Sequence, residues 1–423
     1  MPRIRDEFRR AQVAIGALFL LLGFQYATWA SRLPAVKARL GLSDAEVGLL
    51  LMACGVGAAA SFPLIAAWMK RFGPAALCVV SAGALSLLPL ALGAAPDYPV
   101  ALLVVCADGV GVACLDVAMN AQGARLEELF ARKSMGKLHA TFSGGSLLGA
   151  LLASAMNAAT SSLEAHFAVA AALMLLVLGY ARGGLLDVPA EAAAEPENST
   201  VAASGEPEPR PRKRFRIRVQ IPRPTAVTLW MGLAMAFGTI VEGAMNDWSA
   251  LYLKNVAKAA AGLTPMGIAV FSIAMVIARI GSDDWRRRWG DARVVVLGSV
   301  LACAGLSVAV LLGGVTAALV GFALVGLGIA SVTPCVYVAA ANNGADALAL
   351  VAAMGTVGLL AGPGLIGLIA GAGGLAWAMG AVAIAAAVVA ACTSRITWRA
   401  EPEGERAAAG PAAAATPTPE YTA

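Results

Sequence analysis

Charged residues are scarce in this sequence of 423 residues. Asp, Glu, Lys and Arg together make up 13% of it, whereas roughly 25% is usual in soluble domains. Because 59% of the residues are hydrophobic, a globule built from this chain would not have enough polar groups to cover its surface. The composition therefore excludes an ordinary soluble fold and indicates a chain covered by lipid.

Motifs that mark other functions are missing as well. The sequence has no GxxxxGK[ST] loop, no HExxH pair, no GxSxG turn with a plausible triad and no DNA-binding motif. Its seven cysteines lack paired metal-ligand spacing and fall within apolar runs, where they serve as small packing residues. We therefore expect no enzyme activity, no metal, no cofactor and no nucleic-acid partner.

What the sequence has instead is long apolar runs. Twelve of them approach the roughly 20 residues needed to span a bilayer. Backbone groups in lipid must be satisfied within the chain, so these runs must be helices. The expected spans are 11–32, 45–68, 74–94, 99–122, 139–159, 163–182, 225–251, 264–281, 292–313, 315–341, 345–370 and 373–393. The sequence thus predicts an all-α membrane protein with twelve transmembrane helices.

The basic residues predict the orientation. With the N-terminus in the cytoplasm, 26 of the 31 Lys and Arg residues fall on the inner side and five on the outer side. This asymmetry predicts that both termini lie on the cytoplasmic side of the bacterial inner membrane. The net charge of +5 then reflects topology.

The chain divides into two six-helix halves, residues 1–182 and 225–393. Between them, residues 183–224 first resemble a disordered linker and then turn basic. The basic part is expected either to lie on anionic lipid or to form a solvated loop. Residues 394–423 are expected to form a disordered cytoplasmic tail.

Short matches in the same order relate the two halves. TWAS (28–31) corresponds to DWSA (247–250), and KRFG (70–73) corresponds to RRRWG (286–290). Paired glycines also recur: Gly109 and Gly111 correspond to Gly326 and Gly328, and Gly145 and Gly149 correspond to Gly358 and Gly362. The second set has the four-residue spacing that lets helices approach closely. Two repeated halves are typical of secondary transporters.

These features together resemble a known family. Across residues 11–393 the sequence is similar to major facilitator superfamily transporters. The segments ATWASRLPAVKARLGLSDAEVGLLL, LDVAMNAQG and EGAMNDWSALYL resemble the MosC/YbjJ-like bacterial subgroup. The resemblance implies alternating access around a central cavity lined by the first, fourth, seventh and tenth spans. It also implies cargo of a sugar-like or cyclitol-like kind.

The resemblance further implies a conformational latch in the loop after the second span. Members of the superfamily usually carry an Asp there, but this chain has Lys70, followed by Arg71 and Gly73. The second copy keeps Arg279 and Asp283. The latch is therefore expected to rest mainly on the second half.

Carboxylates inside the apolar runs are the candidate proton-coupling groups, because an ionised side chain at membrane depth is costly. Glu242 and Asn246 share one face of their helix, and Asp247 points about 140° away, near the outer end. Glu242 is expected to lack a fixed cation, so that it binds and releases protons, since desolvation raises the pKa of a carboxylic acid. Asp116 is the expected second acid or substrate anchor, and Asp108 the third candidate.

A polar stripe on the first span completes the site. Gln25, Trp29 and Arg32 lie at i, i+4 and i+7, and Arg32 is expected to pair with Asp247 or to contact an anionic group. Each residue also has a structural alternative: a carboxylate that pins helices, an interfacial Trp or a snorkelling Arg. The expected substrate-binding residues are Gln25, Tyr26, Trp29, Arg32, Asn120, Asn246, Asp247 and Tyr337.

We therefore predict a proton-coupled secondary transporter for a small polar solute. Its expected partners are that solute, protons and membrane lipid, and the expected state is a monomer. The alternatives are a proton-driven exporter of a metabolite or drug, and a transporter-like receptor that moves no cargo. Glycine-rich residues 139–159 lack the proline of the antiporter motif, which disfavours drug export.

Overall fold

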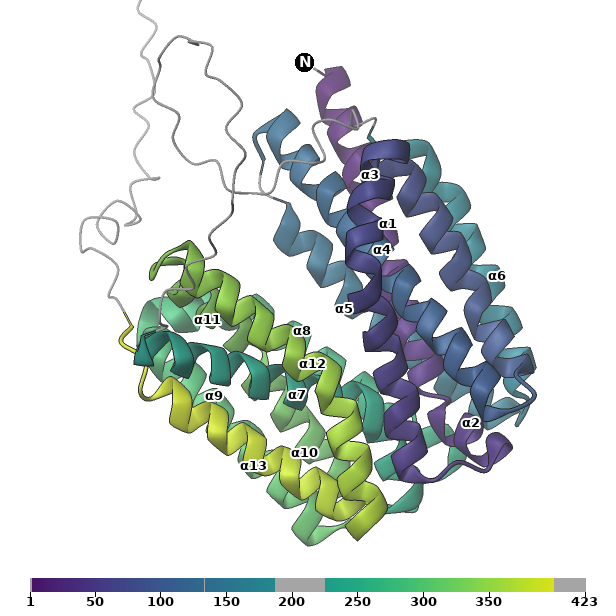
Figure 1. The fold of residues 1–423 in the computed structure, drawn as a ribbon, viewed down its shortest axis with the longest axis vertical. Helices are drawn as coiled ribbons and strands as arrows, with labels where there is room; N and C mark the ends of the chain where they lie inside the picture. The colour runs from purple at the N-terminus through teal and green to yellow at the C-terminus, as the bar shows by residue number, and fades with distance from the viewer. Residues whose placement is uncertain (1, 133, 187–224, 399–423) are drawn as a thin grey trace, which may run out of the picture.

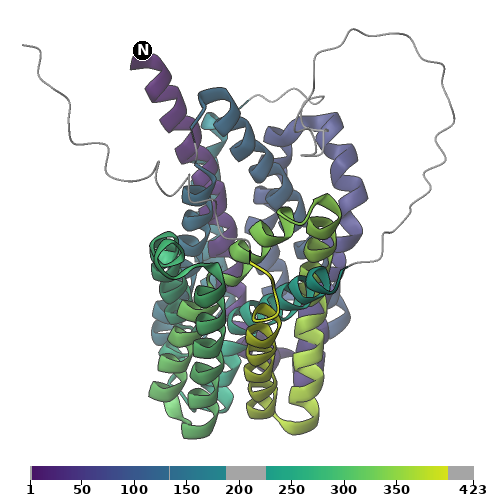
Figure 2. The same cartoon turned by 90° about the vertical axis from the view of Figure 1, so that its left-hand side faces the viewer.

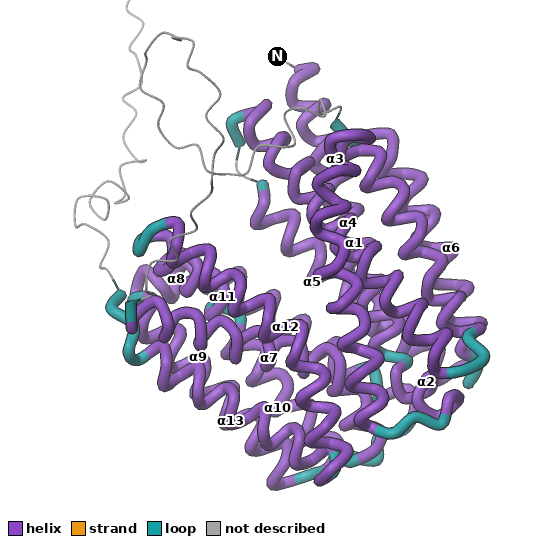
Figure 3. The backbone as a smooth tube through the Cα atoms, viewed as in Figure 1, coloured by secondary structure: helices purple, strands orange, loops and turns teal. Residues whose placement is uncertain are grey.

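The computed structural model describes residues 2–132, 134–186 and 225–398, and the side chains of all of these except residues 2–6, 283 and 345. Helices account for nearly all of this part of the chain, and it contains no strand (Figure 3). The predicted fold class is therefore confirmed. The predicted linker and tail fall almost wholly outside the described residues.

The helices form two groups that lie side by side (Figures 1 and 2). The N-terminal half contains α1 (Pro2–Ala30), α2 (Leu33–Leu40), α3 (Asp44–Ala94), α4 (Tyr98–Phe130), α5 (Met135–Ala159), α6 (Leu163–Ala181) and the short 3₁₀ helix η1 (Arg182–Gly184). The C-terminal half contains α7 (Ala226–Asn255), η2 (Ala261–Leu263), α8 (Met266–Trp289), α9 (Asp291–Leu312), α10 (Gly314–Ile329), α11 (Val332–Ala341), α12 (Ala345–Gly373) and α13 (Leu375–Thr393).

Eleven helical segments in the described part are long and apolar enough to cross a membrane. One of them, α3, has 51 residues, about twice the length that a bilayer requires. It is broken at Gly73, whose φ of 75° and ψ of 162° are not helical, and Pro74 follows. The two limbs of α3 correspond to the predicted spans 45–68 and 74–94, so the described chain provides the twelve predicted crossings.

One short helix was not predicted. The first span ends at Ala30, and α2 follows after a two-residue turn, with Pro34 in its first turn and Gly41 at its C-cap in the left-handed region (φ 64°). Next, Ser43 caps α3 in a capping box with Glu46. The break between α1 and α2 matters for the site, because Arg32 lies in that turn.

The repeated glycines occupy equivalent contacts in the two halves. A Cβ built at Gly145 of α5 would lie 2.0 Å from the carbonyl oxygen of Leu20 in α1, and one at Gly358 of α12 would lie 2.2 Å from that of Ala236 in α7. Similarly, Gly109 of α4 packs on α3, and Gly326 of α10 packs on α8. The predicted close helix crossings are therefore confirmed, and both halves use the same pairs.

The two halves contact each other mainly at one end of the molecule. We call this end the far side, defined by residues 31–43 and 256–265; the opposite end, where the N-terminus lies, is the termini side (Figure 1). On the far side Ser154 donates to the carbonyl of Gly262, and Asn157 donates to that of Ala261. Lys254 donates to the carbonyl of Pro34 over 3.3 Å. Towards the termini side the helices of the two halves diverge (Figure 1).

Candidate functional site

Two adjacent residues of α1 each bind a buried carboxylate, one in each half of the molecule. Gln25 Nε2 donates to Asp108 Oδ1 of α4 over 2.7 Å. Tyr26 Oη donates to Asp247 Oδ1 of α7 over 2.5 Å. Asp108 and Asp247 are 6% and 5% exposed, and within the described chain no basic side chain forms an ion pair with either. The structure therefore brings four of the predicted residues together around one turn of α1. The Tyr26–Asp247 bond joins the two halves, and the Gln25–Asp108 bond lies within the N-terminal half.

The expectations for Asp247 and Arg32 need correction. Asp247 was expected near the membrane interface, and Arg32 was expected either to pair with it or to contact an anionic group of the solute. Instead it is buried against Tyr26, while Arg32 Nη2 donates to the carbonyl of Ser161 over 3.2 Å. The reason is the turn after α1, which directs Arg32 towards the α5–α6 connection. Burial lowers the pKa of the Arg32 guanidinium, and the charge of Glu164 opposes this effect.

Glu242 does have a cation, contrary to the expectation. Arg279 Nη2 of α8 lies 3.4 Å from Glu242 Oε1 of α7, and Arg279 Nη1 donates to Ser143 Oγ of α5 over 3.3 Å. The side chains of Arg279 and Glu242 are 37% and 32% exposed. Because Ser143 belongs to the other half, this exposure opens into the space between the halves. The expected partner of Arg279 in the latch, Asp283, has a side chain outside the described part.

Ser143 was missed by the sequence analysis, although a signal for it existed. It follows His139 by four residues, so both lie on the face of α5 that meets Arg279, whose charge acts on His139. A polar residue one turn after a histidine in an apolar run was the available clue. Asn246, as predicted, shares the face of Glu242, and its Nδ2 donates to the Glu242 carbonyl over 3.1 Å.

Asp116 and Asn120 form a second polar group on α4. Asn120 Nδ2 donates to the Asp116 carbonyl over 2.8 Å and to Asp116 Oδ1 over 3.1 Å. Asp116 is exposed and lies about 180° around the helix from Ala107, which is also exposed. Close to Ala107 on the helix surface, Leu103 is 71% exposed, as expected of a lipid-facing side chain. Asp116 therefore faces away from lipid.

The remaining predicted residues lie apart from this site. Tyr337 is on α11, 36% exposed, and its hydroxyl forms no hydrogen bond within the described part of the chain. Lys70 and Arg71 are exposed near the break in α3, where Arg71 lies over the Phe72 ring at 5.5 Å. Gly73 makes that break. Gly73 therefore forms the turn between the two limbs of α3, because its backbone adopts a conformation that is not helical.

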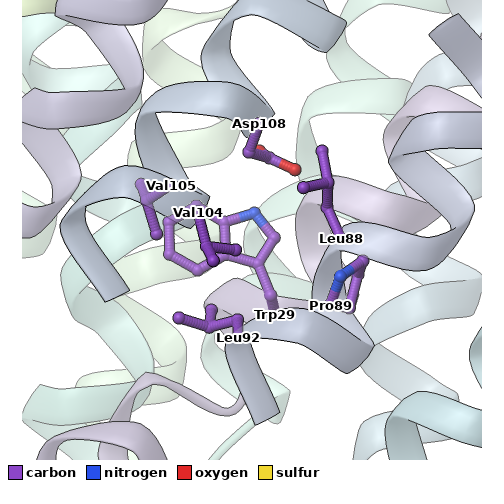
Figure 4. A pocket seen from close by; sticks show the side chains of 7 residues that line it. All are labelled: Trp29, Leu88, Pro89, Leu92, Val104, Val105 and Asp108. Atoms are coloured by element: carbon purple, nitrogen blue, oxygen red, sulfur yellow. The ribbon is translucent and has the colours of Figure 1, made fainter. Parts of the chain in front are cut away.

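A small cavity lies beside Asp108, inside the N-terminal half (Figure 4). Its volume is about 10 Å³, counted as the space open to the centre of a water molecule. The lining residues are Trp29, Leu88, Pro89, Leu92, Val104, Val105 and Asp108. The surface of the cavity is apolar, and the nearby atoms Trp29 Nε1 and Asp108 Oδ2 are buried without a hydrogen-bond partner among the described residues. Among the described residues no group of three or more His, Cys, Asp or Glu side chains is arranged to hold a metal ion.

Comparison with known proteins identifies the family. The model of the Major Facilitator Superfamily matches residues 13–346. The chain belongs to this superfamily of membrane transporters. An uncharacterized MFS-type transporter of Yersinia pestis is 32% identical over 341 residues, covering 78% of this chain and 80% of that protein. The membrane protein MosC of Rhizobium meliloti is 30% identical over 329 residues, covering 78% of this chain and 75% of MosC.

Solved structures show the same fold. The nucleoside transporter NupG superimposes with a TM-score of 0.65 at 13% identity, covering 92% of this chain and 98% of NupG. A bacterial homolog of the human lysosomal transporter Spinster, in an inward-facing and unoccupied conformation, gives 0.69 at 14% identity, covering 92% and 96%. At these identities the likeness concerns the fold alone.

Proposed function

We propose that this protein is a proton-coupled secondary transporter that moves a small polar solute, of the sugar or cyclitol type, across the bacterial inner membrane by alternating access. The observation that carries the proposal is the ion pair of Glu242 and Arg279. It lies inside the apolar spans, is partly exposed between the halves, and is joined to the other half through Ser143. Charges at this depth are retained where they serve function.

The ion pair suits exchange between a proton and a solute. Protonation of Glu242 removes its negative charge, and Arg279 then becomes available to donate to the oxygen atoms of a solute. When the solute leaves, Arg279 recovers Glu242 as its counter-ion and the proton departs. Asn246 and Ser143 provide further polar groups beside this pair, and Asp116 provides an acid on the opposite half.

Asp108 is the second coupling carboxylate in this proposal. It is buried, accepts a hydrogen bond from Gln25, and has no ion-pair partner within the described chain. A buried carboxylate without a cation is stable when neutral, because desolvation disfavours the charged form. Asp108 therefore suits a group that carries a proton between the two conformations.

The basic-residue asymmetry supports an orientation with both termini in the cytoplasm. In that orientation the closed far side faces outward, and the diverging termini side faces the cytoplasm (Figure 1). The conformation is then an inward-facing one. The protein is proposed to act as a monomer, since each half supplies one wall of the site.

The test begins with the solute. Purified protein is screened by thermal shift against sugars, cyclitols and organic acids, and the best binder is used in proteoliposomes with an imposed proton gradient. Glu242→Gln keeps the shape of the side chain and removes its charge. This variant should lose gradient-driven accumulation while retaining solute exchange between the two sides.

A matched control is Glu128→Gln, the same substitution in another ion pair. Glu128 pairs with Arg125 over 2.7 Å, one turn apart on α4, and its side chain is 70% exposed. The Glu128→Gln variant should accumulate solute like the wild type. If Glu242→Gln also accumulates solute against its gradient at the wild-type level, Glu242 is a structural pin and the proposed coupling is wrong.

A further inference from the structure

Two bonded side chains in the N-terminal half are each left with one unpartnered oxygen atom. Gln25 of α1 donates through Nε2 to Asp108 Oδ1 of α4 over 2.7 Å, and this bond is buried. Within the described residues, Gln25 Oε1 and Asp108 Oδ2 are also buried but have no hydrogen-bond partner. Buried polar atoms in proteins are nearly always hydrogen-bonded. The two side chains therefore share one bond and lack a second.

An ionised Asp108 does not fit these surroundings. Its carboxylate would bury a negative charge with a single hydrogen bond, and no ion pair in the described chain includes it. Burying a charge is costly unless the charge is paired and hydrogen-bonded. Moreover, the amide oxygen of Gln25 and both oxygens of an ionised carboxylate are acceptors only. The ionised form therefore leaves Oε1 and Oδ2 unsatisfied.

The cavity beside Asp108 does not supply the missing bonds. Its volume is about 10 Å³ and its surface is apolar, and apolar cavities of proteins stay dry. Trp29 lies across this cavity from Asp108 (Figure 4), and its Nε1 forms no hydrogen bond within the described residues. Solvation of an ionised Asp108 from this side is therefore poor.

The titratable neighbours of Asp108 supply no positive charge. The charge of Asp108 acts on the thiol of Cys54 in α3, and so does the charge of Asp247 in α7. Tyr26, the residue after Gln25, is bonded to Asp247. A thiol, a phenol and a carboxyl group are each either neutral or negative. These neighbours therefore also favour a neutral Asp108.

A proton on Oδ2 would satisfy both unpartnered oxygens at once. A neutral carboxylic acid has one O–H donor beside an acceptor oxygen, and a primary amide has an N–H donor beside an acceptor oxygen. The two groups can therefore pair through two parallel bonds, from Nε2 to Oδ1 and from Oδ2 to Oε1. The first bond is present. Rotation about the last torsion of each side chain, which is soft, aligns the second.

We propose that Asp108 is protonated in this conformation, and that Gln25 is the positioning residue that holds its proton through a cyclic pair of carboxylic acid and amide. The inference rests on the proposed function, in which Asp108 carries a proton between the two conformations. Because the far side is closed here, the proton is separated from the outer side, from which it came. It leaves towards the termini side when the Gln25 amide turns away: the bond between Oδ2 and its hydrogen breaks, and the proton passes to water.

Infrared difference spectroscopy of the purified chain detects this proton without any solute. A protonated carboxylic acid absorbs at a higher frequency than an ionised carboxylate. Subtracting the Asp108→Asn spectrum from the wild-type spectrum should leave an acid band at about pH 7, roughly three pH units above the ordinary pKa of Asp in solution. The matched control is Asp247→Asn, in the other carboxylate bound by this turn of α1, which should keep the band. If the band is missing in the wild type, Asp108 is ionised and the proposal is wrong.

The position of the same band tests Gln25. Gln25→Leu removes both bonds to the carboxyl group and should move the band to a higher frequency, because hydrogen bonds weaken the C=O bond of an acid. Gln122→Leu is the matched control, since Gln122 is equally buried but bonds to the backbone of Leu186. The control should leave the band in place. A band that stays in place in Gln25→Leu would show that the proton is held without Gln25.

Thermal unfolding in detergent tests the second bond of the pair. Asn has the same donor and acceptor as a protonated Asp, so Asp108→Asn should unfold at the wild-type temperature. Asp108→Leu has a similar size but leaves both polar atoms of the Gln25 amide unpartnered, so it should unfold at a lower temperature. If Asp108→Asn is destabilised as much as Asp108→Leu, the bond from Oδ2 to Oε1 does not form and the pair is wrong.

Transport in proteoliposomes, with the solute found by the thermal-shift screen, separates this inference from the proposed function. Asp108→Asn cannot release a proton, so it should lose accumulation and retain exchange. If it accumulates solute like the wild type although the acid band is present, the coupling role of Asp108 fails and the pair is only structural. If it loses accumulation but the wild type has no acid band, the coupling role stands and the pair is wrong.

Gln25→Leu completes the test. A proton that is held less firmly escapes during the conformational change, so accumulation should fall roughly two- to tenfold, the equivalent of one hydrogen bond, while exchange continues. Wild-type accumulation in this variant would show that Gln25 does not hold the transported proton, and would overturn the proposal.

Discussion

Tyr26 of α1 donates a hydrogen bond of 2.5 Å to Asp247 of α7. The bond connects the two halves at a partly buried position, and Gln25, the residue before Tyr26, binds Asp108 in its own half. One turn of α1 thus holds a carboxylate of each half. Any movement that separates the halves on the far side must break the first bond and can leave the second intact.

Tyr26→Phe tests the bond between the halves. Without the hydroxyl, buried Asp247 loses its donor, which costs about 1–3 kcal/mol and favours a conformation in which water reaches Asp247. We expect faster maleimide labelling of an Ala30→Cys probe, since Ala30 is fully buried in a cluster with Ile268 and Ala269 of the other half in this conformation. The control is Tyr252→Phe, because Tyr252 donates to the Ala309 carbonyl within the C-terminal half. It should lower thermal stability without changing the labelling rate, and equal labelling in both variants would contradict the prediction.

Gly48→Ala tests the far-side contact between α3 and α12. A Cβ at Gly48 would lie 2.8 Å from the Cα of Gly367 and from the carbonyl oxygen of Pro363, so a methyl group pushes the halves apart. Double electron–electron resonance should then measure a longer distance between two spin labels, one placed on the far side of each half. Gly380→Ala in α13 is the control, since a Cβ there has nothing within 4 Å and should add up to about 1 kcal/mol of helix stability. An unchanged distance in Gly48→Ala would show that the helices adjust locally to the methyl group and that the halves do not separate.

Gly73→Ala tests the break between the two limbs of α3. The φ of 75° and ψ of 162° at Gly73 belong to a region that is essentially restricted to glycine, where a side chain costs about 1–3 kcal/mol. We expect a lower thermal unfolding temperature in detergent. Gly136→Ala in α5, where a Cβ also has nothing within 4 Å, should not be destabilised. If both variants melt at the wild-type temperature, the break tolerates a side chain and its backbone must adjust.

Reporter fusions test the orientation. The 26 basic residues assigned to one side and five to the other predict that both termini are cytoplasmic. A fluorescent protein fused after Arg399 should fluoresce in a bacterial host, and alkaline phosphatase inserted at Asp97 should be active in the periplasm. The reverse pattern would mean that the far side faces the cytoplasm and that the proposed orientation is wrong.

The sequence by itself determined the number of crossings and the division into two halves. Apolar runs of membrane length must be helical because lipid offers the backbone no partners, and the repeated glycines marked the same helix crossings in both halves. It also showed that four candidate carboxylates lie inside apolar runs, but it did not show that Asp108 and Asp247 are the buried ones. Periodicity assigns Glu242 and Asn246 to one face, and Gln25, Trp29 and Arg32 to another.

Only the tertiary structure decided what each face meets. The stripe on α1 was expected to face a solute but is directed into its own half, because the identity of a neighbouring helix is not written in the spacing of a single helix. Glu242 acquired Arg279 because α7 packs beside α8, which brings side chains 37 positions apart within 3.4 Å. Arg32 turned away from Asp247 because α1 ends at Ala30. The pairing of charges depends on long-range packing, whereas the depth of a charge depends on local composition.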